Sequence, residues 1–222
     1  MRQSHILALA TIFGAAAAAP KIPIHSTSFA SDKRAPQSSS VQKSGRGVSV
    51  RQSKACFVVG DTELPQEVAD VADSLAATVK CDATYPTLDG VPDTLSGDVT
   101  YDSIDFSQSD QTPLAFALSK FTTAETTGGK LADTDLTLFQ NGLNVYLATE
   151  AAVRSIGADP SQIKVPKFFL QMQVSRIQTA QGNPPTDAGQ QVDHLRDKVL
   201  KNAPKEDKSL LDQVTKLATV VQ

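Results

Sequence analysis

The chain is poor in the residues on which most enzyme and metal sites depend. Its 222 residues include no tryptophan, three histidines, two cysteines and only 5% aromatic side chains. Sugar subsites usually need flat apolar rings for stacking, so this composition argues against sugar hydrolysis by a pair of carboxylates. Two cysteines without neighbouring histidine or cysteine partners also do not make a four-ligand zinc set.

Serine-based hydrolysis has equally little support. No GxSxG sequence is present to position a serine nucleophile, and His194 is the only histidine after residue 25. His194 lies among Asp193, Asp197 and Lys198, and such alternating charges are typical of a solvent-exposed helix face. The alternative is a general base or metal ligand that acts together with Asp197, one helical turn away. We expect His194 to lie on such an exposed helix face.

Long apolar runs are also absent, and the longest is a short one near the first residue. Met1 and Arg2 give a basic start, and residues 6–19 form an uncharged apolar run that contains many small residues. This run is shorter than the roughly 20 residues that span a bilayer. The pattern predicts a signal peptide over residues 1–19 and a secreted protein without a membrane anchor in its mature form.

Residues 20–54 are rich in Ser, Pro, Gly, Lys and Arg. Such a composition buries little apolar surface, so we expect a disordered pro-segment or linker. Within it, Lys33 and Arg34 form a dibasic pair and a candidate processing site, and cleavage there gives a product that begins at Ala35. An ordinary charged linker is the alternative.

Charge is divided unevenly along the chain. Residues 1–54 hold 8 Lys and Arg and 1 Asp, a net charge of +7, whereas residues 55–222 have a net charge of −10. The acidic residues concentrate in 55–135, where 15 acids and 3 bases give −12. An acidic surface repels phosphate backbones, so nucleic acid is not an expected partner. The basic N-terminal part could pair with the acidic half or with an anionic wall polymer, although a solvated linker is favoured.

Helical periodicity predicts one mainly α domain over residues 55–222, either a helix bundle or a helical array. Apolar residues recur at helical spacing in six segments: 64–80, 112–121, 133–157, 165–182, 192–199 and 210–221. Each apolar stripe is expected to face the core. Residues 57–59 are expected to form a short strand or an extended lead-in to the first helix.

Glu150 is the most notable acid in these segments because it lies in mid-helix beside apolar residues. The favoured interpretation is an exposed side chain that pairs with Arg154 at i+4. The alternative is a catalytic carboxylate.

Residues 82–110 interrupt the helical pattern and predict a long loop rich in Asp, Pro and Gly, with short strands around 99–101 and 104–106. Its aspartates have the oxygen ligands that calcium takes: Asp89, Asp93, Asp98, Asp102 and Asp105. Their spacing does not match an EF-hand loop, so turn formation is the favoured interpretation.

Cys56 and Cys81 are expected to form a disulfide, because the secretory pathway is oxidising. In the chain-entropy model, closing a loop of this length stabilises the fold by about 3.5 kcal/mol. The bridge would join the lead-in to the far end of the helix over residues 64–80 and would mark the start of the folded domain.

Several runs of the sequence carry a resemblance: "CFVVGDTELPQEV", "VPDTLSGDVTYDSIDFSQSDQTPLAFAL", "LNVYLATEAAVRSIG", "KVPKFFLQMQVSRIQTAQGNPPT" and "DHLRDKVLKNA". From Cys56 to Ala203 the chain resembles an uncharacterised family of small secreted proteins of filamentous fungi. That resemblance implies origin and secretion and supplies no catalytic residues. The helices "LAFALSKF" and "YLATEAAVRS" are more loosely similar to fungal secreted proteins of ferritin-like fold. The di-metal site of that family needs Glu-x-x-His pairs, whereas Val153 follows Glu150 at i+3, so its metal ligands are lacking here.

We therefore expect a secreted, non-catalytic surface, cell-wall or host-facing interaction protein that uses no cofactor or metal. Its expected partner is a protein or a cell-wall polymer. One alternative is an apoplastic effector or elicitor that a host recognises. The other is a hydrolase or metal-dependent enzyme that uses His194 or Glu150, which requires these side chains to converge with a further polar group in one cleft.

Overall fold

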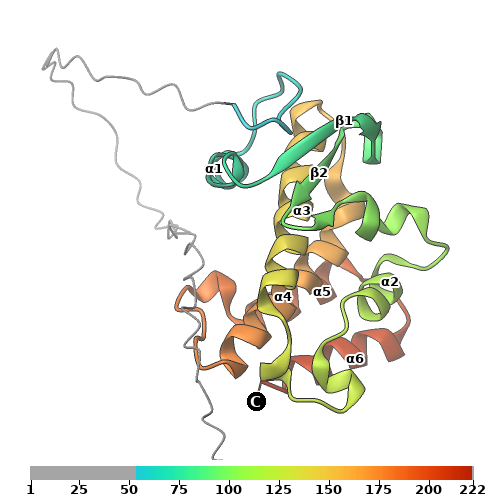
Figure 1. Ribbon diagram of the computed structural model, residues 1–222. Coiled ribbons are helices and arrows are strands. Elements are labelled where there is room, and N and C mark those ends of the chain that lie inside the picture. Colours follow the sequence, from blue (N-terminus) through green and yellow to red (C-terminus); the bar gives the residue numbers. More distant parts are fainter. Residues whose placement is uncertain (1–53, 222) are drawn as a thin grey trace, which may run out of the picture.

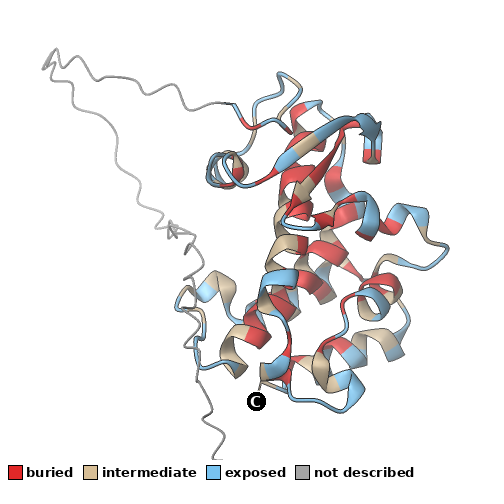
Figure 2. Cartoon of the chain, in the orientation of Figure 1, coloured by how far each residue is buried: buried red, intermediate tan, exposed pale blue. Residues whose placement is uncertain are grey.

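Two long helices form the centre of the fold. In the computed structural model, which describes residues 54–221, α3 (Leu136–Ser155) packs against α4 (Lys164–Ala180). Most residues of both helices are buried (Figure 2). Gly157 and Gly182 follow the two helices with φ of 78° and 79°. Glycine adopts this left-handed conformation without strain, so it ends each helix where the sequence predicts.

Four shorter helices surround this pair: α1 (Gln66–Leu75), α2 (Pro113–Lys120), α5 (Val192–Asn202) and α6 (Lys208–Ala218) (Figure 1). α1 packs against α3, α2 and α5 pack against α4, and α6 packs against α5 and α2. All six predicted helical segments are therefore confirmed, as is the mainly α class. None of the helices in residues 54–221 combines the length and apolar character needed to cross a membrane.

The prediction of a long loop over residues 82–110 is wrong in part. This region contributes to a three-stranded antiparallel sheet of β1 (Lys80–Pro86), β2 (Pro92–Ser96) and β3 (Val99–Thr100). The strand predicted near residue 99 is confirmed as β3, whereas residues 104–106 belong to two 3₁₀ turns, Asp102–Ile104 and Phe106–Gln108. β2 and β3 pack against α3, and the sheet lies with α1 at the top of Figure 1, away from α2 and α6.

A tight turn joins β2 to β3. Ser96 pairs with Val99, so only Gly97 and Asp98 connect the strands, and Gly97 has a φ of 56°. A glycine with positive φ at the first position of a two-residue loop matches the twist of an antiparallel hairpin. A Cβ atom on Gly97 would also lie 2.3 Å from the Asn141 side chain of α3, so the sheet and the helix are closely packed here.

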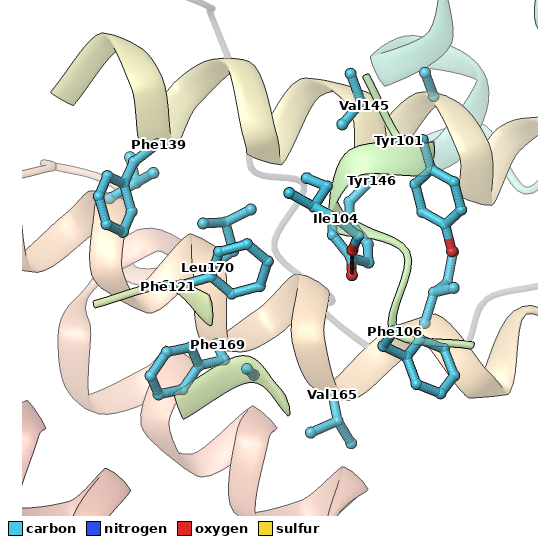
Figure 3. Close-up of a cluster of buried hydrophobic side chains, with 14 of the residues drawn as sticks. Tyr101, Ile104, Phe106, Phe121, Phe139, Val145, Tyr146, Val165, Phe169 and Leu170 are labelled. Carbon is cyan, nitrogen blue, oxygen red and sulfur yellow. Dashed lines mark hydrogen bonds between the residues drawn. The ribbon is translucent and has the colours of Figure 1, made fainter. Parts of the chain in front are cut away.

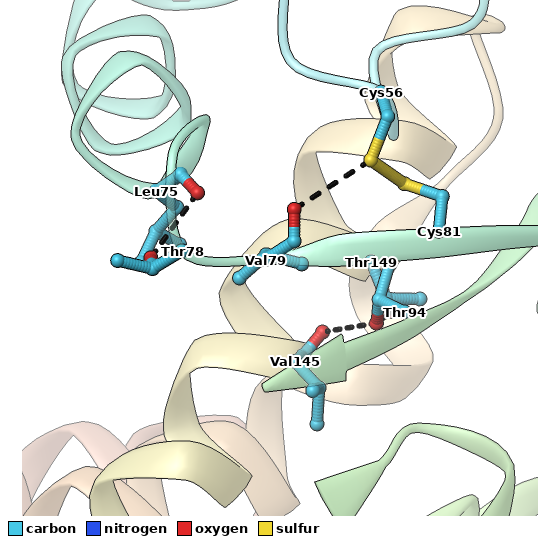
Figure 4. Close-up of a disulfide and its surroundings, with 8 residues drawn as sticks. All are labelled: Cys56, Leu75, Thr78, Val79, Cys81, Thr94, Val145 and Thr149. Carbon is cyan, nitrogen blue, oxygen red and sulfur yellow. Dashed lines mark hydrogen bonds between the residues drawn. A yellow bond between two sulfur atoms is a disulfide. The ribbon is translucent and has the colours of Figure 1, made fainter. Parts of the chain in front are cut away.

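The predicted disulfide between Cys56 and Cys81 is confirmed, with a Cα–Cα distance of 6.0 Å (Figure 4). Its setting differs from the expectation, because α1 ends at Leu75 and Cys81 lies in β1. The bridge therefore joins the lead-in to the sheet. The lead-in itself begins with a turn in which Val58 N donates to Ala55 O, and no strand forms at residues 57–59.

The predicted signal peptide over residues 1–19, the pro-segment and the Lys33–Arg34 processing site lie outside the residues that the structure describes. These remain predictions from the sequence.

Candidate functional site

The two residues that an enzyme was expected to use lie in different environments. His194 is exposed on α5, and within residues 54–221 it forms no hydrogen bond or ion pair. Its neighbours Asp193 and Asp197 both pair with Arg196. Glu150, in contrast, is buried in α3. The structure therefore does not bring His194 and Glu150 together in one cleft.

The aspartates considered for calcium are spread along the sheet and its connections: Asp89, Asp93, Asp98, Asp102 and Asp105. Asp93 is 8% exposed, and its carboxylate accepts a hydrogen bond of 3.0 Å from Asp102 N. Asp105 caps the 3₁₀ turn that follows it by accepting from Ser107 N at 2.9 Å. Within residues 54–221, no group of three or more His, Cys, Asp or Glu side chains is arranged to hold a metal ion.

Glu150 belongs to a buried ion cluster that we define as Glu150, Arg154 and Lys167. The Oε1 atom of Glu150 accepts hydrogen bonds from Arg154 Nε at 3.1 Å and Nη2 at 2.9 Å. Its Oε2 atom accepts from the Lys167 ammonium, which comes from α4. Glu150 and Lys167 are only 5% and 7% exposed. The predicted pair with Arg154 is confirmed, but the expectation of an exposed Glu150 is wrong because α4 covers it.

The charges in the ion cluster favour the ionised form of the Glu150 carboxylate. Burial by itself would raise the pKa of Glu150, but the charges and hydrogen bonds of Lys167 and Arg154 outweigh it and keep the pKa below its usual 4.5. A general base works best when its pKa lies near the pH of the reaction. The pKa of Glu150 is instead moved further below neutral pH. Both carboxylate oxygens are also engaged. The cluster therefore suits the docking of α3 onto α4 rather than proton transfer.

The ring of Phe168 lies close to both the ion cluster and a lysine of α5. The Lys167 ammonium lies 4.4 Å from the ring centroid of Phe168, and the Lys198 ammonium of α5 lies 5.1 Å from the same centroid. Ring faces attract cations at such distances. Sequence reasoning missed Lys167 because nothing local links it to Glu150, which precedes it by 17 residues.

A cavity of about 320 Å³ lies near the other end of α3, where β3, α2, α3 and α4 approach one another. Its base, which we call the cavity floor, is made of buried residues from four parts of the fold: Val99, Ile104, Phe121, Phe139, Gly142 and Leu170. Figure 3 shows Ile104, Phe121, Phe139 and Leu170 within the buried hydrophobic cluster. Because the floor is wholly apolar, it can enclose hydrocarbon but offers no side-chain hydrogen bond.

The mouth of this cavity has a different character. The surrounding residues, which we call the cavity rim, are all exposed: Asp98, Ser103, Lys120, Thr122 and Leu138. Four of them are polar. The fifth, Leu138, is 55% exposed and is one of the few large apolar side chains on the described surface. Apolar walls with a few convergent polar groups are the usual composition of a small-molecule site.

Comparison with known families assigns the chain to one of them. A family model matches residues 58–222, which is nearly the whole folded part. The chain belongs to the family described as a domain of unknown function, DUF7143. Comparison with curated proteins and with solved structures found no match. The DUF7143 match begins two residues after Cys56, so the disulfide joins a residue just before the matched region to Cys81 within it. The expected lack of an assigned biochemical role agrees with the description of this family, while fungal origin and ferritin-like similarity stay predictions.

Proposed function

We propose that this protein is secreted by a filamentous fungus and acts by binding rather than by catalysis. The observation that carries the proposal is the Cys56–Cys81 disulfide, because such bonds form and persist in oxidising compartments such as the extracellular space. The signal-peptide pattern of residues 1–19 supports the same route. The resemblance of the folded part to small secreted fungal proteins supports the origin.

The environments of the chemically capable residues favour binding. Glu150 is a carboxylate with both oxygens engaged by cations, and His194 is exposed on α5 among charged neighbours. Neither has the convergent arrangement that acid-base catalysis requires. The expected partner is a protein or cell-wall polymer at the cell surface, and the acidic charge of residues 55–135 argues against nucleic acid.

Secretion and binding can be tested in one expression system. The full-length chain and a form without residues 1–19 are expressed in a filamentous fungus, and medium, cell walls and cytosol are separated. We expect the full-length protein in the medium or wall fraction and the shortened form in the cytosol. Retention of the full-length chain in the cytosol would contradict secretion.

The second arm separates binding from catalysis. Purified protein is sedimented with isolated cell walls, and captured protein partners are compared with those of His194→Ala. We expect this variant to fold and bind as the original does, because His194 is exposed and forms no hydrogen bond or ion pair within residues 54–221. Loss of biological activity in His194→Ala with unchanged wall or partner binding would instead indicate an enzyme. Binding only to proteins of a host would assign the host-facing role.

A further inference from the structure

The cavity described above has a glycine in its floor. Gly142 lies within the 20-residue helix α3, in a buried position at the cavity floor. Glycine weakens a helix interior, so its place there needs a packing reason. A Cβ atom on Gly142 would lie 3.2 Å from Leu170 Cδ2 and 3.7 Å from Ile104 Cδ1. The missing side chain therefore lets Leu170 and Ile104 approach α3 closely, and a methyl group at this position would have to displace Leu170 at the cavity floor.

The dimensions and walls limit what can enter. A volume of about 320 Å³ is at the lower end of ligand sites, which range from roughly 300 to 1,000 Å³. This space suits a small molecule and excludes a helix of a partner protein. Phe121 and Phe139 contribute aromatic rings to the floor, and rings pack well against the face or edge of another ring. The floor therefore suits a compact hydrocarbon ring.

The side chains of the cavity rim indicate which kind of polar group a ligand could carry there. Lys120 and Asp98 carry opposite charges, and within residues 54–221 neither forms an ion pair or a side-chain hydrogen bond. Thr122 adds a hydroxyl beside them, and Ser103 adds another, which donates to Thr100 O at 2.7 Å and can still accept. Donors and acceptors are thus both present, without an excess of either charge. Such a rim matches an uncharged group that both donates and accepts a hydrogen bond.

We propose that this cavity binds a small, uncharged molecule made of an aromatic or alicyclic ring with one hydroxyl group. The ring lies on the floor against Phe121, Phe139 and Leu170. The hydroxyl group lies at the rim, within reach of the unpaired polar side chains there. Binding excludes water from the floor and leaves the two rim charges solvated, so no buried charge is left without a partner.

The probe is 2-naphthol, whose binding to the full-length secreted protein is followed by its fluorescence and by isothermal titration calorimetry. For a ligand of this size we expect a dissociation constant on the order of 0.1 mM. Gly142→Ala narrows the floor and favours the helix, so it should weaken binding about tenfold or more without loss of folding. Leu138→Ser removes the apolar wall of the rim from an exposed position and should also weaken binding.

The matched control is Ile156→Ser, because Ile156 is also an exposed apolar residue next to α3 but lies outside the cavity. It should bind 2-naphthol as the original protein does, and circular dichroism should show the same fold in all variants. Absence of measurable 2-naphthol binding at millimolar concentration would overturn the proposal. So would binding that Gly142→Ala and Leu138→Ser both leave unchanged.

Head-group selectivity is tested with molecules that share the ring system. Naphthalene, 2-naphthoate and 2-naphthylmethylammonium should each bind at least several-fold more weakly than 2-naphthol. Tighter binding of the carboxylate or the ammonium compound would contradict an uncharged head group. Equal binding of naphthalene would show that the rim does not recognise the hydroxyl group.

Discussion

Removing one member of the buried ion cluster should destabilise the protein strongly. Glu150→Leu leaves the Lys167 ammonium, at 7% exposure, without its counterion. Breaking a buried pair in this way typically costs about 3–5 kcal/mol of unfolding free energy. Lys167→Met should cost less, about 2–3 kcal/mol, because Glu150 keeps Arg154, whose side chain is 27% exposed and partly solvated.

Replacing both buried charges at once should restore most of this loss. The double variant Glu150→Leu, Lys167→Met fills the site with apolar side chains and leaves no buried charge unpaired, and Arg154 can turn toward solvent. Such replacements are often neutral or stabilising, so we expect the double variant within about 2 kcal/mol of the original protein. The single variants together cost at least about 5 kcal/mol, so the double-mutant cycle should then give a coupling energy of at least about 3 kcal/mol.

The measurement is urea unfolding followed by circular dichroism, with the free energy of unfolding obtained by linear extrapolation. Asp193→Ala is the control, because it breaks an exposed ion pair with Arg196 and should cost less than about 1 kcal/mol. If Glu150→Leu and Lys167→Met each cost no more than this control, the two charges are not buried together as the structure shows. Docking of α3 onto α4 through this ion cluster would then be refuted.

The same cluster predicts a pH dependence. The pKa of Glu150 is lower in the folded protein than its usual 4.5, so the unfolded chain binds more protons in the interval between these two values. The stabilisation by Glu150 is therefore complete above about pH 4.5 and is lost as the pH falls through the lowered pKa. The stability difference between the original protein and Glu150→Leu should therefore be constant above about pH 4.5 and shrink as the pH falls below that value. A difference that stays constant would show that Glu150 keeps its usual pKa.

Two further variants test the lead-in. Replacing both Cys56 and Cys81 by serine should lower the free energy of unfolding by about 3.5 kcal/mol, and a loss below about 1 kcal/mol in urea unfolding would show that the bridge adds little constraint. Gly60→Ala should cost about 3 kcal/mol or more, because its Cβ would lie 2.0 Å from the backbone oxygen of Ser155. The control Gly189→Ala has 3.4 Å to its nearest neighbour and should change little, and equal thermal stability of these two variants would contradict the packing of the lead-in on α3.

The helices could be predicted because each buries a continuous apolar stripe, and because glycine ends α3 and α4. The sheet could not be predicted in the same way. β1 is exposed along almost its whole length, so it shows no alternation of apolar and polar residues. The buried side of β2 includes Thr94 and Ser96, which bond to α3 through Thr149 and Asn141. Polar residues on an inner face conceal a strand from hydrophobic periodicity. The short turn at Gly97 was the available signal.

The candidate sites show the same division between local and distant contacts. Spacing along one helix predicts the bond between Glu150 and Arg154, because i and i+4 side chains meet on a helix. The partner Lys167 depends on how α3 and α4 pack, and no local pattern encodes that. The cavity depends on four separate segments, and its local sign in the sequence is Gly142, a glycine in the interior of a long helix.

Intact mass spectrometry of the protein recovered from the culture medium tests both secretion and the closed disulfide in one measurement. We expect a mass that lacks residues 1–19, or one that begins at Ala35 if Lys33–Arg34 is cleaved. We also expect no addition of alkylating reagent to Cys56 or Cys81 unless a reductant is added first. A chain that retains Met1, or two thiols alkylated without reductant, would contradict the account.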